Sequence, residues 1–421
     1  MLCCFDNLFV NLWGLFYLYL PPTFLNSFVV LPTNPNEILI INKTLKASHS
    51  AGLDGLAPHI FSPLMDILAY PLSEIINCSL VNGIVPTEIK SAKVIPTFKQ
   101  GDKYELSNYR PISVLSYFSK FFERIMYDRL FSYINHKQLL YPLQHGFQPG
   151  HSTSMSLLDI QDRISKSMDK NDFSIGIFLD LAKAFDSVDH NILITKLQHY
   201  GIRGLALDWF KSYLSDRTQC VLCNGSLSNL QKILIGVPQG SILGPLLFLV
   251  FINDLPNSSS LLRFILFADD SNAFLSHSSY DHLIKLANCE LARTADWFKA
   301  NKLSLNISKT NFIIFRTAKK IIPIIDTDLN IDNVIIPQVE TSKFLGVIID
   351  QHLKWNFHIN AISKKIVKNT GIIKRIAHLL PQHILKNLYS TLIYPYLTYC
   401  NLIWTATYPS HLVKLQILQK K

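Results

Sequence analysis

The spacing of hydrophobic and polar positions predicts a protein that mixes helices and strands. Residues 92–113 form two apolar stretches around a polar turn, which predicts a pair of strands. Ser152 or Thr153 is placed to cap a helix that runs to about Met168. The first third of the chain also contains an amphipathic stretch at 36–47, and its apolar runs predict two further helices at 58–81 and 117–135.

The middle of the chain has the most regular pattern. A short apolar strand is predicted at 174–180, ending in Asp180, and Asp189 is placed to cap a helix that Gly201 ends. Residues 263–277 predict a hairpin with Asp269 and Asp270 at its tip. The remaining predicted elements are a turn leading into an apolar helix at 236–254, a helix at 280–300, and strands at 311–315 and 344–350.

The two ends of the chain differ in character. The apolar run from Leu8 to Leu20 is shorter than the roughly 20 residues that span a bilayer, and no basic residue precedes it as in a signal peptide. We expect a buried segment or a start translated from outside the ancestral reading frame, with a membrane anchor as the alternative. After Gln351 the pattern is helical, with Ile362 and Ile366 on one face.

Composition narrows the class of protein. Among 421 residues, 48% are hydrophobic and 17% charged, which excludes a disordered chain and suits two or three joined subdomains. Lys and Arg number 40 against 30 Asp and Glu, for a net charge of +10. Residues 351–421 contain ten basic residues and no acidic one, so the whole excess lies there and indicates contact with a polyanion.

The cysteines indicate neither a disulfide framework nor a zinc site. Seven Cys are scattered along the chain, which suits a reducing compartment. Cys220 and Cys223 have zinc-like spacing, but no second pair follows them. They also lie within a predicted strand, where their side chains would face opposite ways.

Acidic residues that end apolar strands are the strongest candidates for chemistry. Asp180 closes one strand, and Asp269 with Asp270 closes another. Carboxylates brought together there would repel one another unless a cation bridged them. Carboxylate oxygens suit Mg²⁺ or Mn²⁺, and two such ions support in-line phosphoryl transfer to a 3′-hydroxyl. A solvated turn is the ordinary alternative for an isolated pair of Asp residues.

Seven sequence blocks, in a fixed order, carry a family resemblance. The chain resembles the reverse transcriptases of non-LTR (LINE-like) retrotransposons, and is most similar to the jockey-like group, from about Asn36 to its C-terminus. The blocks are NYRPIS (108–113), HGFQPGHST (145–153), FLDLAKAFDSVDH (178–190), GVPQGSILGPLLF (236–248), FADD (267–270), LSLNISKTNFIIF (303–315) and FLGVIID (344–350).

The resemblance implies a site for two Mg²⁺ ions, with Mn²⁺ as the alternative. Asp180 and Asp269 would be the principal metal ligands, assisted by the backbone carbonyl of Leu181. Asp270 would contact metal less directly. Lys309 matches the lysine proposed to protonate the leaving pyrophosphate, although an exposed surface lysine is a serious alternative.

It also implies a nucleotide-binding site. Phe185 matches the aromatic residue under the nucleotide sugar, where its ring would clash with a 2′-hydroxyl, although core packing would also explain it. Gln239 and Gly240 match the turn beside the incoming nucleotide, a turn that could require the glycine by itself. Asp186 and Asp189 are expected to be turn or cap residues rather than ligands.

Basic residues are expected to hold phosphates. Arg110 matches the residue that clamps the triphosphate, and either Lys93 or Lys99 would add a second charge. The element at 344–350 resembles the primer grip. The basic helices that follow resemble the thumb, with Lys364, Lys365, Lys368, Lys374 and Arg375 as candidate nucleic-acid contacts.

We therefore expect an α+β right-hand polymerase fold. Residues 1–35 form an apolar segment unlike the family, 36–172 the fingers, 173–350 a palm with an antiparallel sheet, and 351–421 a basic helical thumb. This thumb stops where the family's thumb continues, and no endonuclease-like segment precedes the fingers. A fragment or a decayed copy of a mobile element is therefore expected.

The expected activity is RNA-directed DNA polymerisation. Its partners would be an RNA template, a DNA primer and deoxynucleoside triphosphates, with no stable membrane partner. By resemblance it would act in the nucleus, with the cytoplasm as a second location for a ribonucleoprotein. The alternatives are a catalytically inactive nucleic-acid-binding remnant and a group II intron-type maturase.

Overall fold

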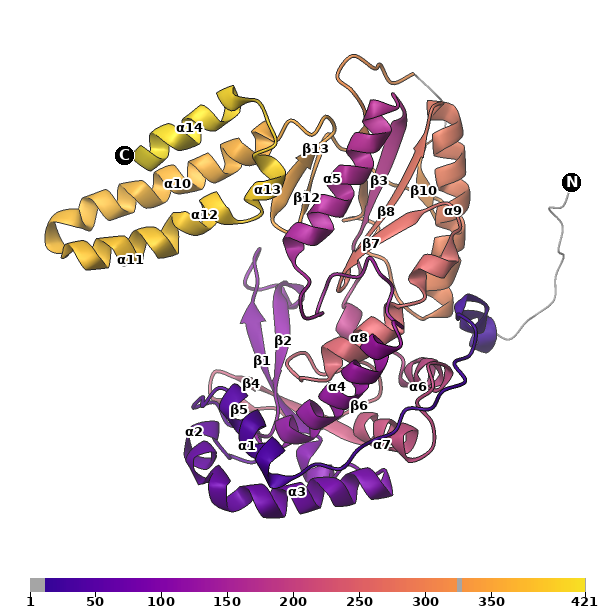
Figure 1. The fold of residues 1–421 in the computed structure, drawn as a ribbon, viewed down its shortest axis with the longest axis vertical. Helices are drawn as coiled ribbons and strands as arrows, with labels where there is room; N and C mark the ends of the chain where they lie inside the picture. The colour runs from indigo at the N-terminus through magenta and orange to yellow at the C-terminus, as the bar shows by residue number, and fades with distance from the viewer. Residues whose placement is uncertain (1–11, 324–327, 421) are drawn as a thin grey trace, which may run out of the picture. The chain divides into compact units, whose positions relative to one another are not determined.

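The structure is a computed structural model that describes residues 12–323 and 328–420. The chain divides into two units, each assembled from three separate stretches of sequence (Figure 1). The predicted boundaries between fingers, palm and thumb stay a prediction. The first unit comprises the residues up to Tyr141 with 182–258 and 296–304, and the second comprises 142–181, 259–295 and the residues from Leu305 onward.

Helices dominate the N-terminal part of the first unit. Both helices predicted there are present, although the first is divided at Ser62–Leu64, and the amphipathic stretch forms α1. Helix α3 packs against α1 through a buried face. Their bounds are η1 Leu12–Tyr19, α1 Pro35–Thr44, α2 Pro58–Phe61, η2 Ser62–Leu64, α3 Met65–Asn82, η3 Thr87–Ile89 and α4 Ser119–His136.

One helical stretch in the described part of the chain, Pro58–Asn82, is long and apolar enough to cross a membrane. It contains α2 and α3, and the side chains of Met65, Ala69 and Ile76 are buried in the first unit. A core helix shows the same burial, so its composition alone is weak support for a membrane span.

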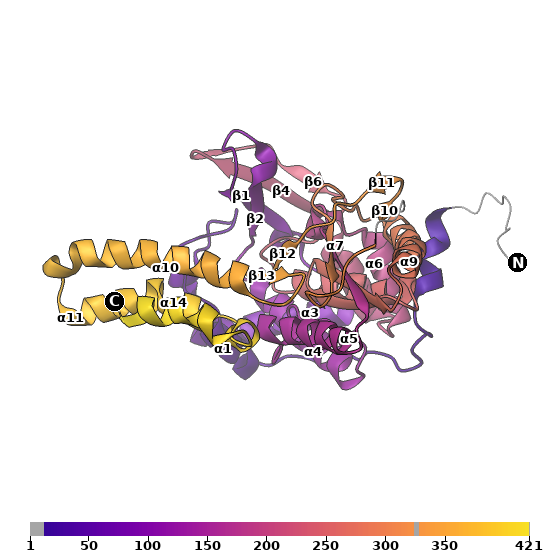
Figure 2. The same cartoon turned by 90° about the horizontal axis from the view of Figure 1, so that it is seen from above.

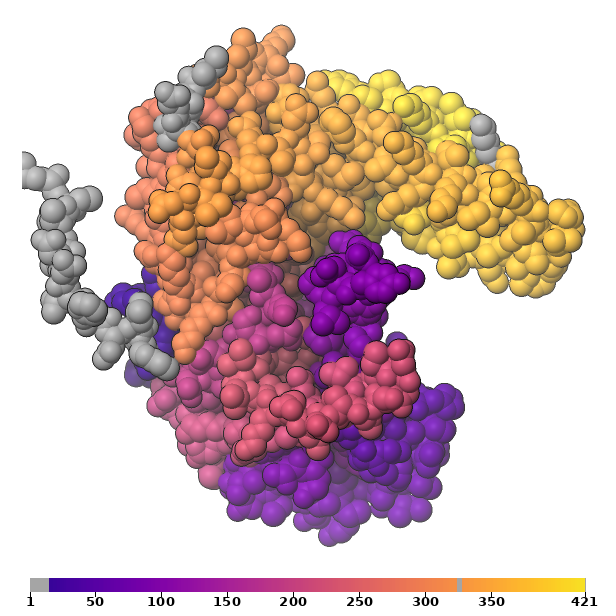
Figure 3. Space-filling view, turned by 180° about the vertical axis from the view of Figure 1, so that it is seen from behind, coloured from indigo at the N-terminus to yellow at the C-terminus, as the bar shows by residue number. Residues whose placement is uncertain are grey.

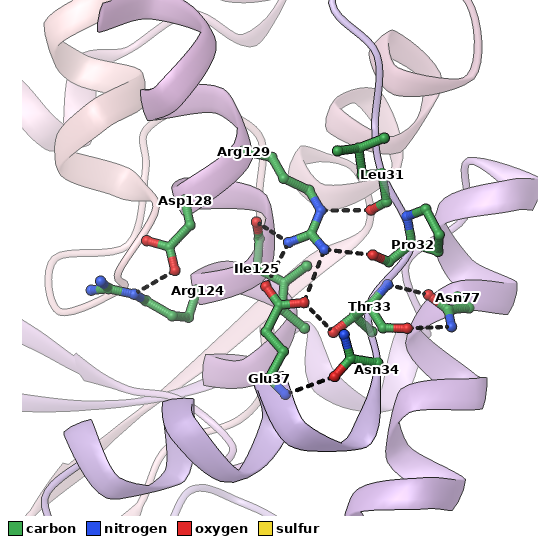
Figure 4. A network of polar contacts seen from close by, with 10 residues as sticks. All are labelled: Leu31, Pro32, Thr33, Asn34, Glu37, Asn77, Arg124, Ile125, Asp128 and Arg129. Carbon is green, nitrogen blue, oxygen red and sulfur yellow. Dashed lines mark hydrogen bonds and ion pairs between the residues drawn. The ribbon is translucent and has the colours of Figure 1, made fainter.

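The apolar N-terminal segment is held to the first unit at its end (Figure 4). The guanidinium of Arg129 donates to the carbonyl oxygens of Leu31 and Pro32 at 2.6 and 2.9 Å, and to the carboxylate of Glu37 at 2.9 and 3.0 Å. This segment was predicted to be buried, and the prediction is correct only in part. Phe16 is buried, whereas Leu25 is exposed. Residues 1–11, which include the start of the apolar run, lie outside the described residues.

The first unit contains a mixed sheet. Its strands are ordered β2-β1-β4-β5, with β6 also paired to β4, and β1 is antiparallel to β2 but parallel to β4. Cys220 is buried and Cys223 exposed on β4, as expected for residues on opposite faces of a strand. The bounds are β1 Ser91–Phe98, η4 Leu106–Asn108, β2 Tyr109–Val114, β4 Arg217–Cys223, β5 Ser226–Leu227 and β6 Gln231–Ile233.

Two of the remaining helices of the first unit, α6 and α8, lie where the sequence predicts, whereas α7 was not predicted. Asp189 accepts hydrogen bonds from the backbone N–H groups of Asn191 and Ile192, both at 3.0 Å, and thereby caps α6 as predicted. The apolar helix α8 is buried almost throughout. The bounds are η5 Ala184–Ser187, α6 His190–His199, α7 Leu205–Leu214, α8 Gly244–Ile252 and η6 Leu255–Ser258.

A four-stranded antiparallel sheet forms the centre of the second unit (Figure 1). The strand order is β7-β8-β3-β9, and every residue of β3 is buried, as predicted for an apolar strand. Helix α5 packs against β3 and β7, and Ser152 caps it. The bounds are α5 Thr153–Asp169, β3 Phe173–Leu179, β7 Arg263–Phe267, β8 Asp270–His277, α9 Tyr280–Ala300 and β9 Asn311–Phe315.

The β7–β8 hairpin corrects one detail of the sequence analysis. Phe267 pairs with Asp270, so the two turn residues are Ala268 and Asp269, and Asp270 is the first residue of β8. The prediction placed both Asp residues in the turn. It was wrong by one residue because Ala268 takes the positive φ of 57° that sequence rules reserve for Gly, Asn or Asp.

The rest of the described second unit contains two small two-stranded hairpins, followed by helices. Helices α10 and α14 lie side by side (Figure 2). Ile362 and Ile366, predicted to share one helix face, are both buried on α10. The helices after residue 351 form one continuous lobe, amber to yellow in Figure 3. The bounds are β10 Asn330–Ile331, β11 Val334–Ile335, β12 Thr341–Phe344, β13 Val347–Asp350, α10 Asn356–Ile376, η7 Ala377–Leu379, α11 Gln382–Leu392, α12 Tyr394–Thr398, α13 Asn401–Trp404 and α14 Pro409–Lys420.

Candidate active site

Strand register gathers the predicted acidic residues at one end of the second unit's sheet. In the antiparallel pairing of β3 with β8, Leu179 lies opposite Ser271. The next residue along β3, Asp180, therefore reaches the level of Asp270. Asp269 adjoins them because it occupies the two-residue turn. Asp180 is half-buried, whereas Asp269 and Asp270 are exposed.

Lys309 lies at the same end of the sheet. Phe178 of β3 pairs with Asn311, so the loop that precedes β9 reaches the end of β3. This loop is fastened to the main chain of Asp180, whose carbonyl oxygen accepts from the Asn306 N–H at 2.8 Å. The Lys309 side chain is exposed. Four predicted catalytic residues thus come to one sheet end from segments distant in sequence.

The oxygen-rich chemistry of this sheet end suits a hard divalent cation. Carboxylates of Asp180, Asp269 and Asp270, with the backbone carbonyl of Leu181, would supply oxygen ligands alone, as Mg²⁺ prefers. Among the described residues, no group of three or more Asp, Glu, His or Cys side chains stands close enough to hold a metal ion. Register places these residues at one sheet end, and their assignment as metal ligands stays a prediction.

In the first unit, the segment that contains Phe185 contacts the segment that contains Gln239. The Phe185 ring stacks on Phe248 with centroids 4.8 Å apart, and its carbonyl oxygen accepts from the Val237 N–H at 2.8 Å. Gly240 takes a φ of 123°, and a Cβ there would lie 2.6 Å from the carbonyl oxygen of Ser113. The glycine is therefore required by a close approach of backbones.

Asp186 has a role that sequence reasoning missed. The side-chain Nε2 of Gln239 donates to Oδ1 of Asp186 at 2.9 Å. Burial raises the pKa of Asp186, and the hydrogen bond from Gln239 only partly opposes this effect. Asp186 was predicted to be a turn or cap residue, and it does lie in the short helix η5. It also fixes the orientation of the Gln239 amide.

A cavity of about 350 Å³ opens beside this pair in the first unit. Its two basic lining residues, Lys183 and Lys232, were not among the sequence candidates. Lys183 lies only three residues after Asp180 in the motif, which was the available signal; Lys232 follows no recognised block. The residues that line the cavity are Pro111, Ser113, Lys183, Asp186, Gln219, Lys232, Ile233, Leu234, Ile235, Gly236, Val237, Pro238 and Gln239.

The basic residues predicted to bind phosphate share one face of the β1–β2 hairpin. Arg110 pairs with Thr97, so Lys99 lies diagonally from Arg110, whereas Lys93 lies four residues along β1 from that pair. The Lys93 ammonium donates to the carbonyl oxygen of Gly52 at 3.3 Å, while Lys99 is exposed. None of the three lines the cavity described above.

The predicted nucleic-acid contacts lie on the solvent side of α10. Lys365 packs over the ring of Tyr396 at 5.3 Å. Ile362 and Ile366 turn the opposite face into the core. The helix therefore separates an apolar face from a basic one. Its exposed basic residues are Lys364, Lys365, Lys368, Lys374 and Arg375.

Comparisons with known proteins identify relatives across most of the chain. A family model described as reverse transcriptase (RNA-dependent DNA polymerase) matches residues 98–349. The probable RNA-directed DNA polymerase from transposon BS of Drosophila melanogaster is 29% identical over 416 residues, which cover 94% of this chain and 44% of the relative. The RNA-directed DNA polymerase from mobile element jockey of the same species is 27% identical over 404 residues, covering 92% of this chain and 41% of the relative. The chain thus spans less than half the length of these relatives.

Proposed function

Because the chain belongs to the reverse transcriptase (RNA-dependent DNA polymerase) family, we propose that it adds deoxynucleotides to the 3′-end of a primer, directed by an RNA template. The register that brings Asp180 level with Asp270 beside the Asp269 turn carries this proposal. These carboxylates come from segments 89 residues apart in the sequence. Like charges brought to one sheet end repel one another unless a cation bridges them.

The acidic sheet end would hold two Mg²⁺ ions, with Mn²⁺ as a substitute. Asp180 and Asp269 would be the principal ligands, with Leu181 and Asp270 contributing. The bound cations would favour ionisation of the primer 3′-hydroxyl and offset the charge that develops on pyrophosphate. The protein's part is to hold oxygen ligands on rigid strands, so that little reorganisation accompanies the reaction.

Lys309 would donate a proton to the leaving pyrophosphate. The loop that carries Lys309 is hydrogen-bonded to the backbone of Asp180 through Asn306. The positions of Lys309 and Asp180 are therefore linked. An ammonium group is a suitable general acid for a phosphate oxygen that gains charge as its bond breaks.

Nucleotide selection would depend on the first unit. Phe185, fixed by Phe248 and by the backbone of Val237, would exclude a 2′-hydroxyl by its bulk. Gln239 donates one amide hydrogen to Asp186, which leaves its carbonyl oxygen oriented for the sugar or base. Arg110, with Lys99 diagonal to it, would bind the triphosphate.

The basic face of α10 would hold the template and primer by their phosphates. Five exposed basic side chains on one helix neutralise backbone charge without reading bases. Binding should therefore be sequence-independent and should weaken as salt increases.

Primer extension tests the proposal. Purified chain is given a DNA primer annealed to RNA or to DNA, deoxynucleotides and Mg²⁺, and is compared with Asp269→Ala. Asp281→Ala, which removes an exposed carboxylate of α9 paired to Lys285, is the matched control. We expect RNA-templated extension by the wild type and the control, and none by Asp269→Ala, with duplex binding retained in all three. Binding without extension by the wild type would indicate an inactive remnant instead.

A further inference from the structure

The turn that carries Asp269 has a strained backbone. Ala268, the first turn residue, has a φ of 57°. A side chain at positive φ is disfavoured, so this conformation persists only where surrounding contacts hold it. Ala268 is buried although the two Asp residues that follow are exposed. The contact that holds it comes from a segment far away in the sequence.

Gln144 provides that contact. Its side-chain Oε1 accepts a hydrogen bond from the backbone N–H of Ala268 at 3.0 Å and a second from the N–H of Gly146 at 2.8 Å. The side chain is 2% exposed. Both partners are N–H donors, so the assignment of the amide oxygen follows from the bonds themselves.

The segment Leu143–Gly146, here called the strap, runs alongside β7. The Leu266 N–H donates to the Leu143 carbonyl oxygen at 2.9 Å, and the His145 N–H donates to the Leu266 carbonyl oxygen at 2.8 Å. Gly146 closes this contact, because a Cβ there would lie 2.1 Å from the backbone nitrogen of Ala268. Only glycine allows the strap to reach the turn.

The strap also lies against α5. The ring Nε2 of His145 lies 2.8 Å from Oδ2 of Asp159, and the ring is buried. The strap is therefore packed between the turn and the main helix of the second unit. Rigid support of this kind is what keeps metal ligands in a productive geometry.

Gln144 is poorly explained by packing alone. Within the described residues, Nε2 of its amide has no hydrogen-bond partner. Burying an unpaired N–H group is unfavourable, and an apolar side chain of similar size would avoid it. An apolar side chain would not supply the oxygen that accepts from both Gly146 and Ala268.

We propose that Gln144 is a positioning residue, which holds the Ala268–Asp269 turn so that the Asp269 carboxylate is presented to the catalytic cations. The role in catalysis rests on the proposed function, whereas the hold on the turn does not. The amide touches neither substrate nor reacting atoms. It acts through the backbone of the turn.

Hydrogen exchange of the full chain tests the hold on the turn. Gln144→Met keeps the volume and removes the acceptor, and Gln144→Asn withdraws the acceptor if the first variant does not fold. Gln148→Met is the control, because the Gln148 side chain donates to the carbonyl oxygen of Gln144 and not to the turn. We expect the Ala268 amide to exchange at least about tenfold faster in the Gln144 variants and unchanged in the control. Equal protection in all proteins would overturn the proposal.

Primer extension at varied Mg²⁺ concentration tests the catalytic part. We expect the Gln144 variants to need several times more Mg²⁺ for half-maximal rate and to lose about tenfold in kcat, with little change in the KM for nucleotide. A wild-type Mg²⁺ midpoint in a variant with an unprotected turn would overturn it. If the wild type itself does not extend primers, the proposed function fails, while hydrogen exchange still decides whether Gln144 holds the turn.

Discussion

The ammonium nitrogen of Lys196 lies 2.7 Å from Oδ1 of Asp254, with both side chains wholly buried in the first unit. The same ammonium donates to the Phe251 carbonyl oxygen at 2.6 Å and lies 5.1 Å from the centre of the Trp297 ring. Burial lowers the pKa of Lys196 and raises the pKa of Asp254, and the attraction between the two opposes both effects. The pair ties α6 to the segment after α8.

Removing one partner of this pair should lower the free energy of unfolding more than replacing both partners with apolar side chains. We expect Lys196→Met to lower the free energy of unfolding by about 3–5 kcal/mol, because it leaves the Asp254 carboxylate buried without its cation. The double variant Lys196→Met with Asp254→Leu should recover much of that loss. Urea unfolding of the double variant and of both single variants, Lys196→Met and Asp254→Leu, measures the difference. A double variant as unstable as the sum of its two single variants would contradict the expectation.

Phe185 should set the discrimination between deoxynucleotides and ribonucleotides. Phe185→Val shortens the side chain that stacks on Phe248, and should lower the preference for deoxynucleotides by about tenfold or more. The measurement is the ratio of kcat/KM for a deoxynucleotide to that for the matching ribonucleotide. An unchanged ratio would leave the ring with a packing role only.

His358 should make the second unit less stable in acid. Burial, with a smaller effect of Lys365, lowers the pKa of His358 to about 4 from an ordinary value of 6.5. The unfolded chain therefore binds a proton that the folded chain does not between these values. The contribution of His358 to the free energy of unfolding is fully present above pH 6.5 and is lost as pH falls toward 4, by about 3 kcal/mol.

Thermal unfolding at several pH values measures this effect. His358→Gln should flatten the dependence between pH 4 and 6.5, whereas His378→Gln, which changes an exposed histidine on η7, should not. The same acid sensitivity in His358→Gln as in the wild type would exclude His358 as its source.

The basic face of α10 should determine how salt affects duplex binding. Lys364→Gln with Lys368→Gln should reduce the slope of log affinity against log salt by about 0.9 for each charge removed, with little effect of base sequence. Lys285→Gln, on α9 and paired to Asp281, serves as the control. Binding titrations across a range of salt concentrations measure the slope. A slope unchanged in the double variant would place the phosphates elsewhere.

Local chemistry made much of the fold predictable. The cap of α6 by Asp189, the apolar strand β3 and the two faces of α10 all follow from residues adjacent in the sequence or separated by one or two helical turns. Strand order and register do not, because they join segments such as β3 and β8 that lie almost a hundred residues apart. Acidic strand ends indicated a site, but only register shows which carboxylates lie level with one another.

The residues that the sequence analysis missed act through long-range or backbone contacts. Gln144 bonds a main-chain N–H 124 residues away, and no side-chain pattern marks such a bond. Asp186 was assigned from its place after a strand, whereas its hydrogen bond to Gln239 depends on tertiary structure. Ala268 could not be predicted for another reason. Alanine disfavours a positive φ, and the conformation of Ala268 is accompanied by a hydrogen bond to the strap.

Counting bound Mn²⁺ by electron paramagnetic resonance tests the central claim most directly. The sample is the chain with an RNA template, a chain-terminated DNA primer and the next deoxynucleotide, compared with Asp180→Asn and Asp269→Asn. We expect two Mn²⁺ per wild-type complex and at least one fewer in each variant, with nucleic-acid binding unchanged. The same number of bound ions in all three complexes would contradict the assignment of Asp180 and Asp269 as the metal ligands of a polymerase.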